Sequence, residues 1–314
     1  MAACGAAKAA RHPGAFGLPY NAELDSLPRW MNADLHCHSA VSDGTLQPEE
    51  LAARAKANGV ELWALTDHDE IGGQQRAIAA ASSLGLPYLT GTEISVTFAD
   101  VTVHIVGLGF DATSETLKAG LTATRGGRRE RAMEMSEGLE KVGVHGAYEG
   151  ALKYVGNPEL ISRTHFARYL VETKVCADTQ EVFRKFLVEG KPGFVPHRWA
   201  TLKNAVNWIV DAGGLAVIAH PARYRFSANE EFALFSEFKA HGGRGVEVVT
   251  GSHSSADAAR YTETAIEFDL LASRGSDFHS PTESHIDLGS LPPLPAKLTP
   301  VWTALGERIH APAG

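Results

Sequence analysis

The chain has 314 residues, of which 44% are hydrophobic and 21% charged, and its formal net charge is −8. This length and composition suit one large α/β domain, or a domain with a smaller module, and exclude a wholly disordered chain. The excess of acidic residues argues against a protein that binds long nucleic acid through bulk positive charge.

The cysteine count and the hydropathy pattern indicate a cytoplasmic protein that does not enter a membrane. Cys4, Cys37 and Cys176 are too few and too scattered for a disulfide framework or a thiolate zinc site. No apolar run approaches the ~20 residues that a membrane span needs. Residues 1–30 are predicted to be an N-terminal extension without a secretory signal, since basic residues and a proline interrupt its alanine-rich start.

Short apolar runs alternate with amphipathic stretches from residue 33 onward, and this alternation predicts strands alternating with helices. In the first half we predict strands over 33–38, 60–66, 86–90 and 101–110 and helices over 48–58 and 71–84. In the second half we predict strands over 215–219, 245–250 and 270–273 and helices over 230–240 and 255–268. The pattern is typical of an α/β fold in which a parallel sheet or barrel carries helices outside it.

Residues 112–200 differ from the segments on either side. They contain stretches with a helical pattern over 114–142 and 178–189, few convincing strands, and more basic than acidic residues, the reverse of the rest of the chain. We therefore predict a mainly helical insertion over 112–200, set between a first barrel part over 31–111 and a second over 201–314.

Nine histidines and carboxylates lie at or near the ends of the predicted strands, and they are the candidate metal ligands. They are His36, His38, Asp43, His68, Glu93, His104, His220, Asp277 and His279. Because such strand ends meet at one mouth of a parallel barrel, we expect these side chains to converge. Imidazoles with carboxylates and no thiolate suit zinc, manganese or iron. Packing alone does not explain the set, because burying so many unpaired polar groups is costly.

The motifs around these residues resemble those of the PHP (polymerase and histidinol phosphatase) family, from residue 33 to about residue 285. The matching motifs are Asp34-Leu35-His36-Cys37-His38-Ser39, Ser42-Asp43-Gly44, Thr66-Asp67-His68-Asp69, Gly91-Thr92-Glu93, His220-Pro221 and Ser276-Asp277-Phe278-His279. The resemblance implies a distorted (β/α)7 barrel and three divalent metal ions, most often manganese, with iron or zinc as alternatives.

The resemblance also implies how the nine ligands divide among the ions. One ion would be held by His36, His38, Glu93 and Asp277. Glu93 would bridge to a second, held also by His104 and His220, and the third would be held by Asp43, His68 and His279. The implied chemistry is in-line hydrolysis of a phosphoester by a metal-bound hydroxide, with Asp277 as a candidate proton shuttle. Cys37, between two ligands, should face the opposite side and pack.

Basic residues outside this set are the candidate substrate-binding groups. Arg163 and His165 begin a predicted helix of the insertion, where Arg163 either grips a phosphate or covers a solvated helix face. Arg223 lies three residues beyond His220 and must be near the pocket, whereas Lys191 is a weaker candidate. A further group is interpreted as a solvated helix surface rather than a nucleic-acid patch: Arg125, Arg128, Arg129 and Arg131.

The segments Ser162–Ala167 and His220–Tyr224 resemble one branch of the PHP family. Its members release the 3′-phosphate of nucleoside 3′,5′-bisphosphates such as pAp, and related members trim RNA from its 5′ end. We therefore expect a phosphoric ester hydrolase that converts pAp to AMP, with short 5′-phosphorylated RNA as a further substrate and no obligate protein partner. The alternatives are a histidinol-phosphate phosphatase and a non-catalytic PHP module that partners a polymerase.

Overall fold

Seven strands form a nearly closed barrel in the computed structural model, which describes residues 30–311. In barrel order they are β1 (Ala33–Asp34), β2 (Leu62–Leu65), β3 (Tyr88–Phe98), β4 (Val101–Leu108), β6 (Leu215–Ile218), β7 (Gly245–Thr250) and β8 (Leu271–Gly275). The two-residue β5 (Ala200–Thr201) pairs with β3 outside this order. The first and last strands meet where the Leu35 amide donates to the Arg274 carbonyl at 3.1 Å. The predicted distorted (β/α)7 barrel is confirmed.

The barrel departs from an all-parallel sheet at β4, which runs antiparallel to both β3 and β6. Only Ala99 and Asp100 connect β3 to β4, and both have positive φ (46° and 60°), as in a tight two-residue hairpin. Two residues cannot make the crossover that parallel strands require. The prediction of a parallel arrangement was therefore wrong for this strand, and the strand predicted over 86–90 extends to Phe98.

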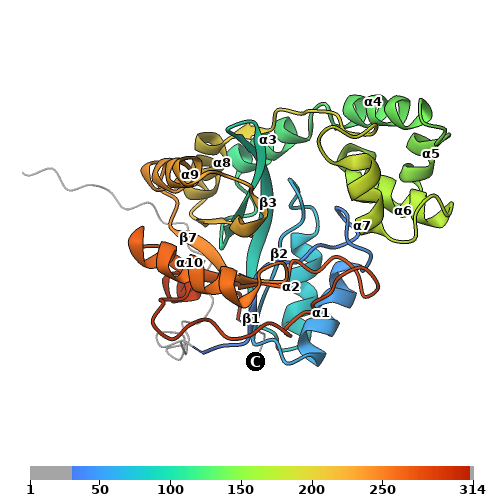
Figure 1. Ribbon diagram of the computed structural model, residues 1–314. Helices are drawn as coiled ribbons and strands as arrows, with labels where there is room; N and C mark the ends of the chain where they lie inside the picture. Colours follow the sequence, from blue (N-terminus) through green and yellow to red (C-terminus); the bar gives the residue numbers. More distant parts are fainter. Residues whose placement is uncertain (1–29, 312–314) are drawn as a thin grey trace, which may run out of the picture.

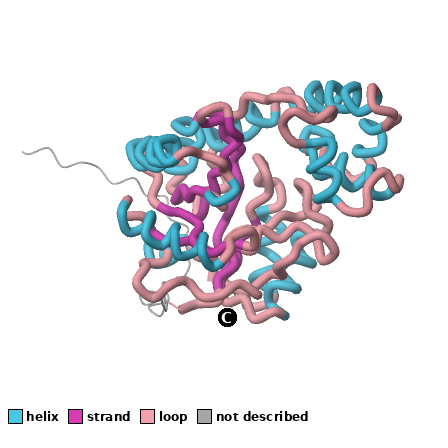
Figure 2. The backbone as a smooth tube through the Cα atoms, in the orientation of Figure 1, coloured by secondary structure: helices cyan, strands magenta, loops and turns pink. Residues whose placement is uncertain are grey.

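Helices cover the outside of the barrel, as Figure 2 shows with the strands at the centre of this part of the molecule. They are α1 (Pro48–Ala57), α2 (Gln74–Ser83), α3 (Glu115–Arg125), α8 (Leu202–Asp211), α9 (Ala228–Ala240) and α10 (Ser255–Glu267). Cys37 is fully buried among α1, α2 and β2, and its sulfur accepts a hydrogen bond from the Trp63 indole, in agreement with its predicted packing role. None of the helices within residues 30–311 is both long and apolar enough to span a bilayer.

The helical insertion stands beside the barrel with its own apolar core (Figure 1). It contains α4 (Arg128–Glu140), α5 (Ala147–Leu152), α6 (Arg163–Glu172) and α7 (Thr179–Val182), followed by a π-helical turn, Phe183–Leu187. Leu117 and Leu121 of α3 instead pack in the main barrel core. We therefore propose that the insertion begins near Gly126 rather than at residue 112.

Two of the predicted helices divide into shorter elements. The helix predicted over 114–142 is interrupted by Gly126 and Gly127, and the positive φ of Gly127 (82°) ends the regular hydrogen bonding between α3 and α4. The helix predicted over 178–189 is α7 with the π-helical turn, and the helix predicted to begin near Arg163 is α6, while α5 and α8 were not predicted. The predicted extension over 1–30 lies outside the described residues, apart from Trp30.

Candidate metal centre

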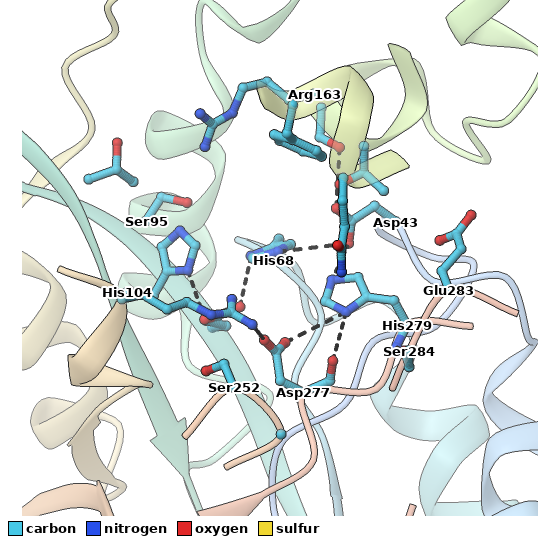
Figure 3. Close-up of a pocket in the computed structure, with 18 of the residues that line it drawn as sticks. Asp43, His68, Ser95, His104, Arg163, Ser252, Asp277, His279, Glu283 and Ser284 are labelled. Atoms are coloured by element: carbon cyan, nitrogen blue, oxygen red, sulfur yellow. Dashed lines mark hydrogen bonds and ion pairs between the residues drawn. The ribbon is translucent and has the colours of Figure 1, made fainter. Parts of the chain in front are cut away.

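The barrel strands and the loops that follow them bring all nine predicted ligands to one mouth of the barrel. His36 and His38 follow β1, His68 follows β2, and Glu93 and His104 lie within β3 and β4. The others come from loops: Asp43 precedes α1, His220 follows β6, and Asp277 and His279 follow β8. Five of the nine lie together in Figure 3: Asp43, His68, His104, Asp277 and His279.

Glu93 is the centre of the cluster, and its fully buried carboxylate faces histidines on two sides. Its Oε1 lies 2.9 Å from both His104 Nδ1 and His220 Nε2. Its Oε2 lies 2.9 Å from His68 Nδ1, 3.2 Å from His38 Nε2 and 3.3 Å from His36 Nε2. A carboxylate whose two oxygens face different histidines would be placed to bridge two metal ions.

The other two carboxylates form similar contacts on either side. Asp277 Oδ1 lies 3.2 Å from His38 Nε2 and 3.5 Å from His36 Nε2. Asp43 Oδ1 lies 3.4 Å from His279 Nε2 and 3.8 Å from His68 Nε2. Among residues 30–311, four overlapping groups could hold a metal ion: His38, Asp43, His68 and His279; His36, Glu93 and His220; His36, His38 and Asp277; and His68, Glu93 and His104.

The electrostatics of the cluster fit bound cations. Burial raises the pKa of Glu93, but the surrounding histidines His104 and His36 outweigh it and hold this pKa well below its usual range. For His38 the signs are reversed: burial lowers its pKa, but the contacts with Asp277 and Glu93 outweigh burial and raise the pKa of His38 to about 10. Without other cations, the carboxylates thus need protons on neighbouring imidazoles, and divalent metals supply the same positive charge.

The unsatisfied polar atoms are a second test of the fit. Several buried ligand atoms make no hydrogen bond of normal geometry, although some of them lie close to another ligand: His38 Nδ1, Asp43 Oδ1, His68 Nδ1, Glu93 Oε2 and His104 Nδ1. Buried polar groups in folded proteins are normally paired, so such a concentration indicates missing partners. Imidazole nitrogens and carboxylate oxygens are suitable ligands for zinc, manganese or iron, and the site therefore fits divalent metals.

Glu247 contacts two of the predicted ligands and was not among the candidates from the sequence. It lies in β7, fully buried, where its Oε1 lies 2.8 Å from His36 Nδ1 and its Oε2 accepts from the His220 amide at 2.7 Å. The contact with Nδ1 leaves the Nε2 atom of His36 for the cluster, which is the usual way in which a carboxylate orients a metal ligand. A charged residue inside an apolar strand, Gly245–Thr250, was the available signal.

Backbone strain is concentrated at the same mouth. His220 has a φ of 27° and Asp277 a φ of 54°, values that non-glycine residues rarely adopt. Hydrogen bonds hold both conformations: Glu247 accepts from the His220 amide, and the Asp277 amide donates to the His36 carbonyl at 2.8 Å. Strain of this kind persists only where surrounding contacts fix it, and it is common at functional sites.

A cavity of about 500 Å³ lies between the metal cluster and the insertion. The barrel contributes side chains that include His104, Ser95 and Asp277, and the insertion contributes Arg163, as Figure 3 shows. Trp199, where the insertion returns to the barrel, also lines it. The cavity thus joins the cluster to basic side chains of the insertion.

The predicted substrate-binding residues differ in how they relate to this cavity. Arg223 and Arg163 both line it, and the Arg223 guanidinium makes an ion pair with Asp277. His165 is buried in the first turn of α6, where its Nδ1 accepts from the Ser162 amide at 3.0 Å. Lys191 is exposed, and neither it nor His165 is among the lining residues.

The interpretation of the arginine cluster as a solvated surface was wrong for three of its four members. Arg128 is buried and ion-paired with Asp69, and Arg131 is half-buried, with both lining the cavity. Arg125 is half-buried against Glu70, and only Arg129 is exposed. The α3–α4 break turns this segment toward the barrel, which a single continuous helix would not do.

Comparison with known proteins agrees with the geometry. Residues 34–190 match the family model of the PHP domain. The chain is 50% identical to a 3′,5′-nucleoside bisphosphate phosphatase from Chromobacterium violaceum, covering 90% of this chain and 99% of that protein. It is 42% identical to a 5′-3′ exoribonuclease from Haemophilus influenzae, covering 86% and 97%. A solved structure from Chromobacterium violaceum, described as an amidohydrolase with bound sulfate and no metal, matches with a TM-score of 0.88 at 50% identity, covering 90% of this chain and 98% of that one. The chain therefore belongs to the PHP family.

Proposed function

We propose that this protein is a metal-dependent phosphoesterase that removes the 3′-phosphate of nucleoside 3′,5′-bisphosphates. The nine clustered residues would hold three divalent ions, most readily manganese, with iron or zinc as alternatives and Glu93 as the bridge. Bound there, the ions would polarise a phosphate ester and lower the pKa of water so that it attacks near neutral pH. A cytoplasmic location and the lack of an obligate protein partner remain predictions from the sequence.

Arg223 and Asp277 are the chain's own groups at the reacting phosphate. Asp277 contacts His36 and His38 through Oδ1 and forms an ion pair with Arg223. The ion pair keeps the guanidinium beside the metal cluster, where it would bind a phosphate oxygen and offset developing negative charge. Asp277 remains our candidate for taking the proton of the attacking water.

Arginines on the cavity wall opposite the metal cluster, here called the arginine wall, support a substrate with a second phosphate. This observation is the basis for our choice of substrate. Arg128, Arg131 and Arg163 line the cavity, and Asp69 is the one carboxylate in ion-pair contact with them among the described residues. Burial and the neighbouring guanidiniums of Arg163 and Arg128 lower the pKa of Arg131 to about 9. An anion bound among these groups would relieve this repulsion, so we place the 5′-phosphate here.

The relatives support this assignment. The protein from Chromobacterium violaceum is named for nucleoside bisphosphates, and it aligns over nearly the whole chain. A histidinol-phosphate phosphatase would share the metal cluster, but its substrate has one phosphate and no use for the arginine wall. A non-catalytic module that partners a polymerase would not need a cavity that joins the cluster to basic side chains.

The test is phosphate release from three substrates by purified protein loaded with manganese. We expect pAp to yield 5′-AMP and inorganic phosphate in equal amounts, measured by nucleotide chromatography and a phosphate assay. Histidinol phosphate and 5′-AMP should react much more slowly. Preferential turnover of histidinol phosphate, or production of 3′-AMP from pAp, would contradict the assignment.

Trimming of short 5′-phosphorylated RNA is a second candidate activity, favoured by the exoribonuclease relative from Haemophilus influenzae. The same geometry serves both reactions, because the 5′-phosphate stays on the arginines while the adjacent 3′-phosphoester is hydrolysed. A short RNA should then lose mononucleotides stepwise from its 5′ end. An oligomer with a 5′-hydroxyl should resist, and equal cleavage of both oligomers would contradict this activity.

A further inference from the structure

Asp69 is a fully buried carboxylate next to the predicted ligand His68. It does not line the cavity, and it belongs to none of the four groups that could hold a metal ion. Its φ of 50° is in the left-handed region, which costs energy for a residue with a side chain. Three separate segments hold it in this conformation. The metal chemistry proposed above gives it no role.

Asp69 is fixed to the strand that carries the bridging ligand. Its amide donates to the Glu93 carbonyl at 2.8 Å. Its Oδ1 accepts from the Ser95 amide at 2.7 Å, and its Oδ2 accepts from the Ser95 hydroxyl at 2.9 Å. These bonds leave the carboxylate little freedom relative to the metal cluster.

The same residue holds both sides of the junction between barrel and insertion. The guanidinium of Arg128, at the start of α4, forms an ion pair with Asp69 Oδ2. Arg125, at the end of α3, donates from Nη1 to the Asp69 carbonyl at 2.7 Å. Gly126 and Gly127 lie between the two arginines, so Asp69 spans the point where the chain turns into the insertion.

Arg128 has a hydrogen-bond donor that no protein group satisfies. Its side chain is 6% exposed and lies over the Trp199 ring at 4.5 Å, and its Nε makes no hydrogen bond although it is buried. A buried guanidinium that lines a cavity and has an unpaired donor is suited to bind an anion there.

We propose that Asp69 is a positioning residue that fixes Arg128, and with it the phosphate-binding wall, at a set distance from the metal ligands. The inference rests on the proposed function, because it assumes that the arginine wall binds the second phosphate. Its consequence is selectivity: the spacing matters for a substrate with two phosphates and not for one that uses only the metal cluster.

The experiment compares Asp69→Asn with the unaltered protein on two ligands. Binding of 5′-AMP, measured by calorimetry, should weaken about tenfold, since a misplaced guanidinium loses one charged hydrogen bond. Hydrolysis of adenosine 3′-phosphate, which lacks the second phosphate, should keep its kcat/KM within about twofold. Glu231→Gln is the matched control, because Glu231 also pairs with an arginine and a hydroxyl but lies on α9, outside the cavity lining.

Two further variants separate positioning from folding. If Asp69 acts through Arg128, the double variant Asp69→Asn/Arg128→Gln should bind 5′-AMP no more weakly than Arg128→Gln alone. Arg125→Gln removes a contact to Asp69 from outside the cavity, and it should weaken 5′-AMP binding by a smaller factor than Asp69→Asn. This variant replaces Asp69→Asn in the experiment if Asp69→Asn does not fold.

Unchanged or tighter 5′-AMP binding in Asp69→Asn, or equal losses on both ligands, would overturn the inference. Failure of the proposed function looks different. The unaltered protein would then leave pAp intact while still binding 5′-AMP in a manner that depends on Asp69.

Discussion

Replacing Glu247 by glutamine tests how the metal ligands are held, without touching a ligand or the cavity. Both Glu247 oxygens are in use, one at 2.8 Å from His36 Nδ1 and the other at 2.7 Å from the His220 amide. In Glu247→Gln, an amide NH2 replaces one oxygen and must face one of these two donors. Either His36 loses its orienting partner or the His220 turn, with its φ of 27°, loses its restraint.

The expected magnitude follows from these contacts. A buried donor left without an acceptor costs about 1–3 kcal/mol. Loss of the residue that orients a metal ligand typically weakens metal binding by about 10–100-fold, or about 1.4–2.7 kcal/mol. We therefore expect metal affinity to fall in this range at the ions held by His36 and His220. The ion at Asp43, which has no contact with Glu247, should keep its affinity.

The assay is a calorimetric titration of metal-free protein with manganese, followed by elemental analysis after dialysis at a fixed manganese concentration. The Glu247→Gln variant should retain one tight ion and lose or weaken the others. Glu231→Gln also replaces a carboxylate that pairs with an arginine, but one on α9 and outside the cavity lining, and this variant should bind manganese as the unaltered protein does. Full metal content with unchanged affinities in Glu247→Gln would refute the role assigned to this carboxylate.

Three further predictions address the ligands, the substrate and the stability. His68→Ala and Asp277→Ala should each lower the metal content in elemental analysis and abolish turnover, and full activity in both would remove them from the site. Arg223→Ala should keep its metal but raise the KM for pAp by about tenfold, because a charged contact to phosphate is lost; an unchanged KM would contradict its role. Burial raises the pKa of Asp287, but hydrogen bonds from Arg54 outweigh it and lower this pKa, so their ion pair stabilises the fold above the unfolded pKa and is lost as the pH falls. Arg54→Gln should therefore cost about 0.5 kcal/mol at pH 7 in denaturant unfolding and nothing at pH 2, and a cost that persists in acid would contradict this linkage.

The barrel and the nine clustered residues could be predicted because their signals are local. Strand-ending polar residues such as His220 and His279 stand out against apolar runs, and short motifs keep their order along the chain. The length of β3 could not be predicted from such local patterns. Its second half continues through Thr97 and Phe98 into a hairpin, and the Ala99-Asp100 turn of this hairpin has no strong sequence signature.

The wall opposite the metals was missed because it depends on tertiary contacts. Arg128 and Arg131 have the sequence neighbourhood of a solvated helix, with acidic residues close by, and only the break at Gly127 turns them into the cavity. Glu247 shows the same limit, since it lies in none of the motifs, and Asp69, although it ends the motif Thr66-Asp67-His68-Asp69, received no role from that position. Their burial, rather than their spacing, identifies them.

The origin of the oxygen in the released phosphate tests the central claim most directly. The metal-loaded protein is incubated with pAp in ¹⁸O-labelled water, and both products are examined by mass spectrometry. Attack of water on the 3′-phosphorus predicts one ¹⁸O atom in the inorganic phosphate and none in the 5′-AMP. Label in the nucleotide, or no phosphate release from a protein shown to hold its metals, would contradict the account.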